Sequence, residues 1–339
     1  MTADPSAAAE EGDSGRLPNI DDVRAAAARI AGLVVHTPIL ENPLLNRRLG
    51  FRLLVKAECL QPIGAFKLRG AMNVVAGLDP ELRSRGVLAW SSGNHAQAVA
   101  AAAAAHGCPA VIVMPADAPR IKRRNTEAWG AEVVEYDRAT GNREALGMAI
   151  AKDRGMTVLP PYDHPGTIAG QGTVGLEIAA DLADDPPDAV YIPCGGGGLT
   201  AGCALALHDW RPELEIHAVE PAAFDDTALS MAAGEPVGHP DAGPSFCDAL
   251  LSPQPGVLTF ALNRRLLAGV SLVTDEAVAQ AMATAFDSWK LVAEPGGAVA
   301  VAAAIAARRD SGDTVVAVIS GGNVDPTLFA EVLTANDPW

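Results

Sequence analysis

Residues 189–202, AVYIPCGGGGLTAG, place four consecutive glycines between an apolar run and a helical pattern. An apolar run that ends in glycine and continues as a helix is typical of a strand, loop and helix in an α/β protein. Because Gly195, Gly196, Gly197 and Gly198 lack side chains, their backbone N–H groups can surround a phosphate at the positive end of the following helix. The stretch therefore predicts an α/β fold with a phosphate site.

The same alternation of strand and helix patterns runs along most of the chain. Short apolar runs at 86–90, 110–114 and 132–136 alternate with helical patterns and predict one small, mainly parallel sheet. Comparable runs from about residue 166 onward predict a second, larger open sheet. In such sheets ligands bind beyond the carboxyl ends of the strands, so the loops that follow strands are the informative ones.

We expect a large domain from residues 19–76 and 164–339, with a small domain inserted at 77–163. Residues 1–18 are acidic and have no basic stretch before an apolar block, so they predict a disordered tail and not a signal peptide.

Composition narrows the class of partner. The formal net charge of −16 disfavours nucleic acid and anionic membrane surfaces, and favours a small-molecule ligand. The five cysteines are widely spaced and contain no C-x-x-C pair, which predicts neither a disulfide framework nor a zinc site and fits a reducing cytoplasm.

The glycine loop also satisfies a dinucleotide-binding pattern. Gly196, Gly198 and Ala201 match G-x-G-x-x-A, and Glu220 follows at about the distance expected for a ribose-binding acid. An NAD-dependent oxidoreductase is therefore a distant alternative. That alternative leaves other polar loops without a role.

One such loop is GAFKLRGA, residues 64–71, which places Lys67 at a predicted helix start. A lysine amine that can become neutral beside an anchored phosphate is what pyridoxal 5'-phosphate requires. Two further loops follow strands, SSGNHAQ from Ser91 and SGGNVD from Ser320.

With these motifs in order, together with IAGQGT, VEPAAFDD and EPGGA, the chain resembles the fold-type-II pyridoxal phosphate enzymes. The resemblance is to the serine/threonine dehydratase (ammonia-lyase) and serine racemase branch, over residues 21–325. It implies an α/β fold like that of the tryptophan synthase β chain, with two open, mainly parallel sheets in a large and a small domain.

The resemblance also implies roles for individual residues. Lys67 would bind the cofactor covalently and act as the catalytic base, with Phe66 against the ring. The glycine loop would hold the phosphate, Asn94 would donate to the phenolic oxygen, and Ser320 would face the ring nitrogen. The substrate would be bound by Ser91, Ser92, Gly93, His95, Arg143 and Tyr162.

The reaction implied is β-elimination from an L-β-hydroxy amino acid (serine, threonine or 3-hydroxyaspartate), which releases a 2-oxo acid and ammonia. Ser92 keeps a second activity open, because in racemase-like members a serine here acts on the cofactor face opposite the lysine. A serine or aspartate-type racemase with Lys67 and Ser92 as its acid/base pair is therefore the alternative.

The resemblance implies two further features. Glu220, the Phe224 carbonyl and Asp226 would bind Mg²⁺ or Ca²⁺, which prefer oxygen ligands. The active form would be a homodimer, in the cytoplasm that the cysteines already suggest. Ala65 and Ala249 depart from the residues usual in relatives and leave substrate choice open.

Overall fold

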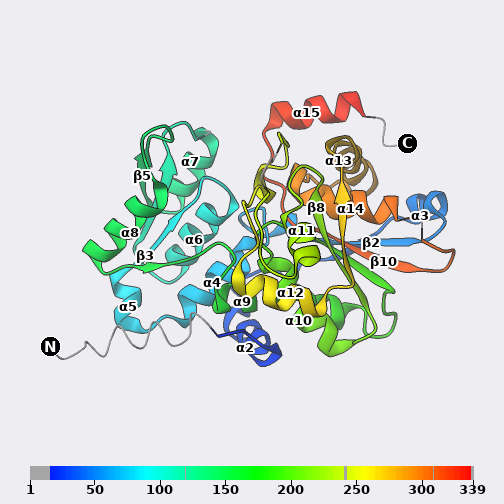
Figure 1. The fold of residues 1–339 in the computed structure, drawn as a ribbon, viewed down its shortest axis with the longest axis horizontal. Helices are drawn as coiled ribbons and strands as arrows, with labels where there is room; N and C mark the ends of the chain where they lie inside the picture. Colours follow the sequence, from blue (N-terminus) through cyan, green and yellow to red (C-terminus); the bar gives the residue numbers. More distant parts are fainter. Residues whose placement is uncertain (1–15, 119, 240–242, 308, 337–339) are drawn as a thin grey trace.

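The structure is a computed structural model that describes residues 16–118, 120–239, 243–307 and 309–336. Residues 1–15 of the expected tail lie outside the described residues. Figure 1 shows two lobes: the helices and strands labelled from α5 to α8 form one, and the larger sheet with its helices forms the other. The predicted α/β fold with two open, mainly parallel sheets is confirmed.

The large sheet has the strand order β1-β2-β10-β7-β8-β9, and only the first pair is antiparallel. Residues alternate along β10. Val316 and Val318 pack on one face of the sheet with helices α9 (Pro165–Asp181) and α10 (Gly198–Trp210), and Val315 packs on the other face with α13 (Asp275–Trp289) and α14 (Pro295–Ala306). Both faces are therefore covered, as expected for parallel strands. Its strands are Ile39–Glu41, Arg52–Ala57, Thr314–Ile319, Ala189–Pro193, Glu215–Pro221 and Gly269–Val273.

The small sheet has the order β5-β4-β3-β6, and all of its pairs are parallel. Its strands are Glu132–Tyr136, Ala110–Pro115, Val87–Trp90 and Thr157–Val158. The three longer strands match the predicted runs, and β6 is an additional edge strand. One face packs against α4 and the alanine-rich helix α6, and the other packs against α8.

The helices are α2 (Ile20–Ile30), α3 (Pro43–Leu49), α4 (Lys67–Gly77), α5 (Pro80–Arg85), α6 (Asn94–Ala105), α7 (Arg120–Ala128), α8 (Arg143–Arg154), α9 (Pro165–Asp181), α10 (Gly198–Trp210), α11 (Asp226–Ala233), α12 (Val257–Leu266), α13 (Asp275–Trp289), α14 (Pro295–Ala306) and α15 (Pro326–Ala335), with 3₁₀ turns η1 (Glu58–Leu60) and η2 (Asp248–Leu250). Among the described residues, no helix is long and apolar enough to cross a membrane.

Helices α4 and α9 lie between the lobes and cross at glycine (Figure 1). A Cβ atom on Gly170 of α9 would lie 2.6 Å from the Cα atom of Gly70 of α4, which is closer than real side chains allow. Only glycine permits this approach. The crossing holds the start of α4, and with it Lys67, against the start of α9.

A buried group of charged residues connects the same two helices to the large sheet. This group, called here the Arg69 network, consists of Lys56, Glu58, Arg69 and Glu177. Arg69 is fully buried and lies 2.7 Å from both Glu58 and Glu177, and Lys56 lies 2.7 Å from Glu177. Burial alone would raise the pKa of Glu58, but the charge and hydrogen bonds of Arg69 lower it below its ordinary value.

Candidate active site

The site residues predicted from the sequence come together where strands of both sheets end. Lys67 begins α4, Asn94 begins α6 after β3, Gly195 follows β7, and Ser320 follows β10. Because the carboxyl ends of parallel strands share one edge of a sheet, loops far apart in sequence meet there.

The segment that carries Lys67 is fixed by the segment that carries Ser320. The backbone N–H of Phe66 donates to the carbonyl of Ser320 over 3.0 Å, and the N–H of Gly322 donates to the carbonyl of Gly64 over 2.9 Å. This short antiparallel contact sets the place where α4 begins, and therefore where the Lys67 side chain starts.

The Lys67 amine lies in a setting that disfavours its charge. Its Nζ donates to the carbonyl of Pro161 over 2.6 Å and lies 5.1 Å from the centroid of the Phe66 ring. No carboxylate pairs with it among the described residues. Burial lowers the pKa of Lys67 to about 8, well below the ordinary lysine value.

The glycine loop forms a cradle that side chains would fill. Gly197 has a φ of +87°, and a Cβ on Gly196 would lie 2.4 Å from ring atoms of Tyr162. Within the described part of the chain, the backbone N–H groups from Gly195 to Leu199 donate to no protein acceptor. Free N–H groups at the start of α10 fit a phosphate, as the sequence predicts.

The loop before α6 offers a second set of backbone donors. The N–H of Gly93 donates to Oγ of Ser91 over 3.2 Å, whereas those of Asn94 and His95 find no acceptor in the described residues. The hydroxyl of Ser92 likewise makes no hydrogen bond there. These groups suit a carboxylate at the N-terminus of α6.

The His95 side chain is turned away from this role. Its Nε2 lies 2.9 Å from the carbonyl of Leu159, and the residue is buried. Burial and then the nearby Lys67 lower the pKa of His95 to about 3, so the ring is neutral. Within the expected substrate set, His95 can therefore offer its backbone N–H but not a charged ring.

Asn94 and Ser320 complete the expected cofactor contacts. Asn94 donates from Nδ2 to Oε1 of Glu294 over 2.6 Å and accepts at Oδ1 from Asn323 over 2.7 Å. Ser320 is buried, and its hydroxyl makes no hydrogen bond to a described residue. Asn323 and the Pro161 carbonyl were not predicted as site groups. The polar residues in SGGN were the only signal for Asn323, and a backbone carbonyl leaves none.

Arg143 and Tyr162 lie at the rim of the site. Tyr162 covers Gly196 and Gly198. Burial, and then the charges of Asp163 and Asp226, raise the pKa of its hydroxyl, whereas a hydrogen bond with Ser252 and the charge of Arg143 lower it. Arg143 is exposed at the start of α8 and forms no ion pair with any described residue. A free guanidinium beside the site can bind an anionic group.

The predicted metal ligands form a second group of acids. Glu220 is the last but one residue of β8 and accepts from the N–H groups of Thr227 and Ala228, at 2.9 and 3.1 Å. Both carboxylate oxygens of Asp226 are buried without a hydrogen-bond partner among the described residues. Burial raises the pKa of Glu220 to about 8 and that of Asp226 to about 7. Buried acids that form no ion pair with a described residue fit a divalent ion, with the Phe224 carbonyl in the turn between them.

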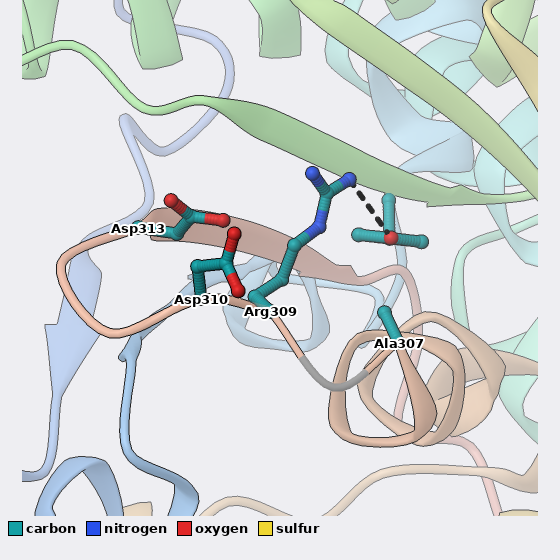
Figure 2. Close-up of a pocket in the computed structure, with 5 residues that line it drawn as sticks. Ala307, Arg309, Asp310 and Asp313 are labelled. Carbon is teal, nitrogen blue, oxygen red and sulfur yellow. Dashed lines mark hydrogen bonds between the residues drawn. The ribbon is translucent and has the colours of Figure 1, made fainter.

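A surface hollow of about 260 Å³ lies elsewhere, near the amino end of β10 (Figure 2). Arg309 lines it and donates to the Tyr191 hydroxyl over 3.2 Å, the dashed line in Figure 2, and it also pairs with Glu215 at 2.5 Å. Its guanidinium is therefore occupied. None of the residues that line the hollow belongs to the loops around Lys67.

These loops and the fold define a class of cofactor-dependent enzyme. The family model described as "Pyridoxal-phosphate dependent enzyme" matches residues 30–321, and the chain belongs to this family.

Among its relatives, the L-threo-3-hydroxyaspartate ammonia-lyase of Saccharomyces cerevisiae is 39% identical over 95% of this chain and 98% of the relative. The serine racemase of Schizosaccharomyces pombe is 38% identical over 94% of this chain and 98% of the relative. The solved structure of maize serine racemase matches with a TM-score of 0.88 at 36% identity, covering 94% of this chain and 98% of that chain.

The structure argues against the NAD-dependent alternative, because Glu220 is not available to bind a ribose. Glu220 is fully buried, and both of its oxygens accept hydrogen bonds from the start of α11. The glycine loop therefore stands as a phosphate cradle without a partner acid for a dinucleotide, which agrees with the family assignment.

Proposed function

We propose that the chain binds pyridoxal 5'-phosphate through Lys67 and catalyses β-elimination from an L-β-hydroxy amino acid, releasing a 2-oxo acid and ammonia. The observation that carries the proposal is the pairing of the Lys67 amine with the glycine cradle. The amine contacts the carbonyl of Pro161, and the next residue, Tyr162, lies directly on the cradle. An amine and a phosphate site are thereby brought to one place.

The residues of the chain then have distinct tasks. When bound, pyridoxal phosphate supplies a sink for negative charge at the substrate Cα. Lys67, with its pKa lowered to about 8, can remove the Cα proton as a neutral base near physiological pH. Free N–H groups at the start of α6 hold the substrate carboxylate. Ser320 offers a hydroxyl, which is too weak an acid to protonate the ring nitrogen fully and so favours elimination over transamination.

For the substrate, we propose 3-hydroxyaspartate ahead of serine and threonine. Arg143 begins α8, has no ion-pair partner among the described residues, and supplies a positive charge with which a second carboxylate can pair. Relatives from Saccharomyces cerevisiae and Pseudomonas sp. carry the name L-threo-3-hydroxyaspartate ammonia-lyase, which supports this choice.

Racemisation is the second candidate activity. It is favoured by the Ser92 hydroxyl, which makes no hydrogen bond within the described residues and is therefore free to return a proton. Relatives named serine racemase support it as well. The two activities differ in product, since elimination yields an oxo acid and racemisation yields the mirror-image amino acid.

We also propose that Glu220, the Phe224 carbonyl and Asp226 bind Mg²⁺ or Ca²⁺. The unpartnered Asp226 oxygens support this, because an uncompensated buried carboxylate is costly. The ion would supply positive charge that stabilises the turn between β8 and α11. It has no part in the proton transfers assigned to Lys67.

A cytoplasmic homodimer acting on a small molecule completes the proposal. All five cysteines are free thiols in the structure, which supports a reducing compartment. Sedimentation at micromolar concentration tests the dimer, and a monomer would overturn it.

The test of function is a substrate panel. Protein loaded with pyridoxal phosphate is incubated with L-serine, D-serine, L-threonine and each 3-hydroxyaspartate isomer, and oxo acid, ammonia and enantiomers are measured. We expect oxo acid from a 3-hydroxyaspartate isomer, with Lys67→Ala inactive. Mirror-image amino acid without oxo acid would assign the protein as a racemase, and no product from any of the panel would refute both activities.

Arg143→Met sharpens the choice of substrate. We expect kcat/KM for 3-hydroxyaspartate to fall about tenfold or more, the scale of one charge-assisted contact, with little change for serine. Arg138→Met is the matched control, because this exposed arginine of the same lobe pairs with Asp117 instead. An equal loss for both substrates would contradict the role given to Arg143.

A further inference from the structure

The amide of Asn94 is held in one orientation by two neighbours of opposite hydrogen-bonding character. Asn323 donates from Nδ2 to Oδ1 of Asn94 over 2.7 Å, and the Nδ2 of Asn94 donates to Glu294 over 2.6 Å. Asn323 also donates to the carbonyl of Ile63 over 2.8 Å, so both of its N–H groups are used. A side-chain amide has two N–H donors, so Asn94 keeps one that has no acceptor in the described part of the chain.

Reversing the Asn94 amide would break both contacts. Its NH₂ group would face the NH₂ group of Asn323. Its carbonyl oxygen would face the carboxylate of Glu294 wherever that acid is ionised, which is above about pH 7 because burial raises the pKa of Glu294 to about 7. Glu294 is 4% exposed, so water cannot easily replace the lost partners. An unpaired buried polar group is costly. Reversal would leave both ends of the Asn94 amide unpaired, so the amide is held in the orientation observed.

Two glycines make room for this chain of hydrogen bonds. A Cβ on Gly321 would lie 2.1 Å from Oε1 of Glu294, and a Cβ on Gly64 would lie 2.7 Å from Oδ1 of Asn323. Any side chain at either position would displace the acid or the amide. The loop before α4, the starts of α6 and α14, and the turn after β10 are thus joined through Asn94.

We propose that Asn323 is a positioning residue which, with Glu294, fixes the Asn94 amide so that its remaining N–H is presented to the phenolic oxygen of pyridoxal phosphate. This inference rests on the proposed function, because it needs the cofactor beside Asn94. Asn323 itself touches neither the cofactor nor the substrate in this account. It acts by deciding which atom of Asn94 faces the ring.

The test replaces the donor of Asn323 with an acceptor. In Asn323→Asp, a carboxylate oxygen faces Oδ1 of Asn94, and reversal of the Asn94 amide relieves this clash. The hydrogen bond to the Ile63 carbonyl is lost in this variant and is not restored by the reversal. The position that held the free N–H then holds an oxygen. We expect the Kd for pyridoxal phosphate, measured by absorbance titration, to rise about tenfold or more, the scale of one hydrogen bond to an oxygen anion.

The analogue 3-deoxypyridoxal phosphate, which lacks the phenolic oxygen, separates positioning from general damage. Its Kd should change less than about twofold between the parental protein and Asn323→Asp, because the contact at issue is missing for both. Asn73→Asp is the matched control. Asn73 is a buried asparagine of α4 bonded to Gly166 and Arg29, away from Asn94, and its variant should treat cofactor and analogue alike.

A second variant asks whether amide orientation is the cause. In the double variant Asn323→Asp with Glu294→Gln, the acceptor is at residue 323 and a donor is at residue 294. A reversed Asn94 amide can then donate to the carboxylate at residue 323 and accept from the amide at residue 294, so it is again paired at both ends. We expect the double variant to unfold at a higher temperature than Asn323→Asp without cofactor, yet to keep the weakened binding of pyridoxal phosphate.

Each outcome decides the inference. Equal weakening of cofactor and analogue by Asn323→Asp, or parental affinity for both, would overturn the positioning role, as would restored cofactor binding in the double variant. Failure of the parental protein to bind pyridoxal phosphate at all would refute the proposed function instead.

Discussion

Two groups of buried charge in this molecule have opposite surroundings. In the Arg69 network every acid faces a cation, and the pKa of Glu58 is lowered despite its burial. In the acidic pair of Glu220 and Asp226, neither acid forms an ion pair with a described residue, and burial raises both pKa values, to about 8 and about 7. Burial alone therefore does not decide the charge state; the partner does.

The comparison separates a charged group that stabilises the fold from charged groups that are available to bind a ligand. The Arg69 network is complete within the chain, and it fastens α4 and α9 to the sheet. The acidic pair and Lys67 are incomplete, since none of these three residues has an oppositely charged partner among the described residues, although Glu220 and Lys67 make hydrogen bonds to the backbone. Groups left without a partner in a folded protein are candidates for binding something from outside.

The largest expected effect comes from removing the central cation of the complete group. Arg69→Met leaves Glu58 fully buried without its main partner and leaves the partly buried Glu177 with Lys56 alone, which should cost about 3–5 kcal/mol of the free energy of unfolding measured in urea. Arg154→Met is the control, because the Arg154–Glu132 pair is exposed, and little or no change is expected there. Equal effects of the two variants would remove the distinction between buried and surface pairs.

The second largest effect is expected from adding a divalent cation to the acidic pair of Glu220 and Asp226. Mg²⁺ or Ca²⁺ at about 100 times its Kd should stabilise the protein by about 2.7 kcal/mol, seen as a rise in Tm. Asp226→Asn should abolish the rise. Asp225→Asn should keep it, because this neighbouring acid already pairs with His239 at 3.0 Å. A rise that persists in Asp226→Asn would place the ion elsewhere.

The smallest effect concerns pH. Because the pKa of Glu58 is lowered by folding, the unfolded chain binds more protons near pH 4, and stability falls as pH drops through this range. Glu58→Gln should lose on the order of 1–2 kcal/mol at pH 7 and show a flatter decline in acid. An acid decline as steep as that of the parental protein would assign it to other carboxylates.

Much of the fold could be predicted from the sequence because buried parallel strands leave long apolar runs. The runs at 86–90, 110–114 and 132–136 match β3, β4 and β5 closely. The two-residue strand β6 and the short antiparallel strand β1 could not be predicted, because pairing at a sheet edge depends on the neighbouring strand and not on local composition.

The site was predictable where a motif carries the chemistry, and not where it depends on contacts distant in sequence. Lys67 and the glycine loop stand out locally. Nothing local shows that Lys56 is fully buried, because its partner Glu177 lies far along the chain. The contact of Asn323 with Asn94 spans 229 positions, and the acceptor for Lys67 is a backbone carbonyl.

The most direct test of the central claim compares the two lysines of these contrasting regions. Protein loaded with pyridoxal phosphate is reduced with borohydride, digested and mapped by mass spectrometry. We predict loss of the visible colour and a stable cofactor label on Lys67, with Lys56 unlabelled because it is held by Glu177. Label on Lys56 or on a surface lysine, with Lys67 unmodified, would contradict the account.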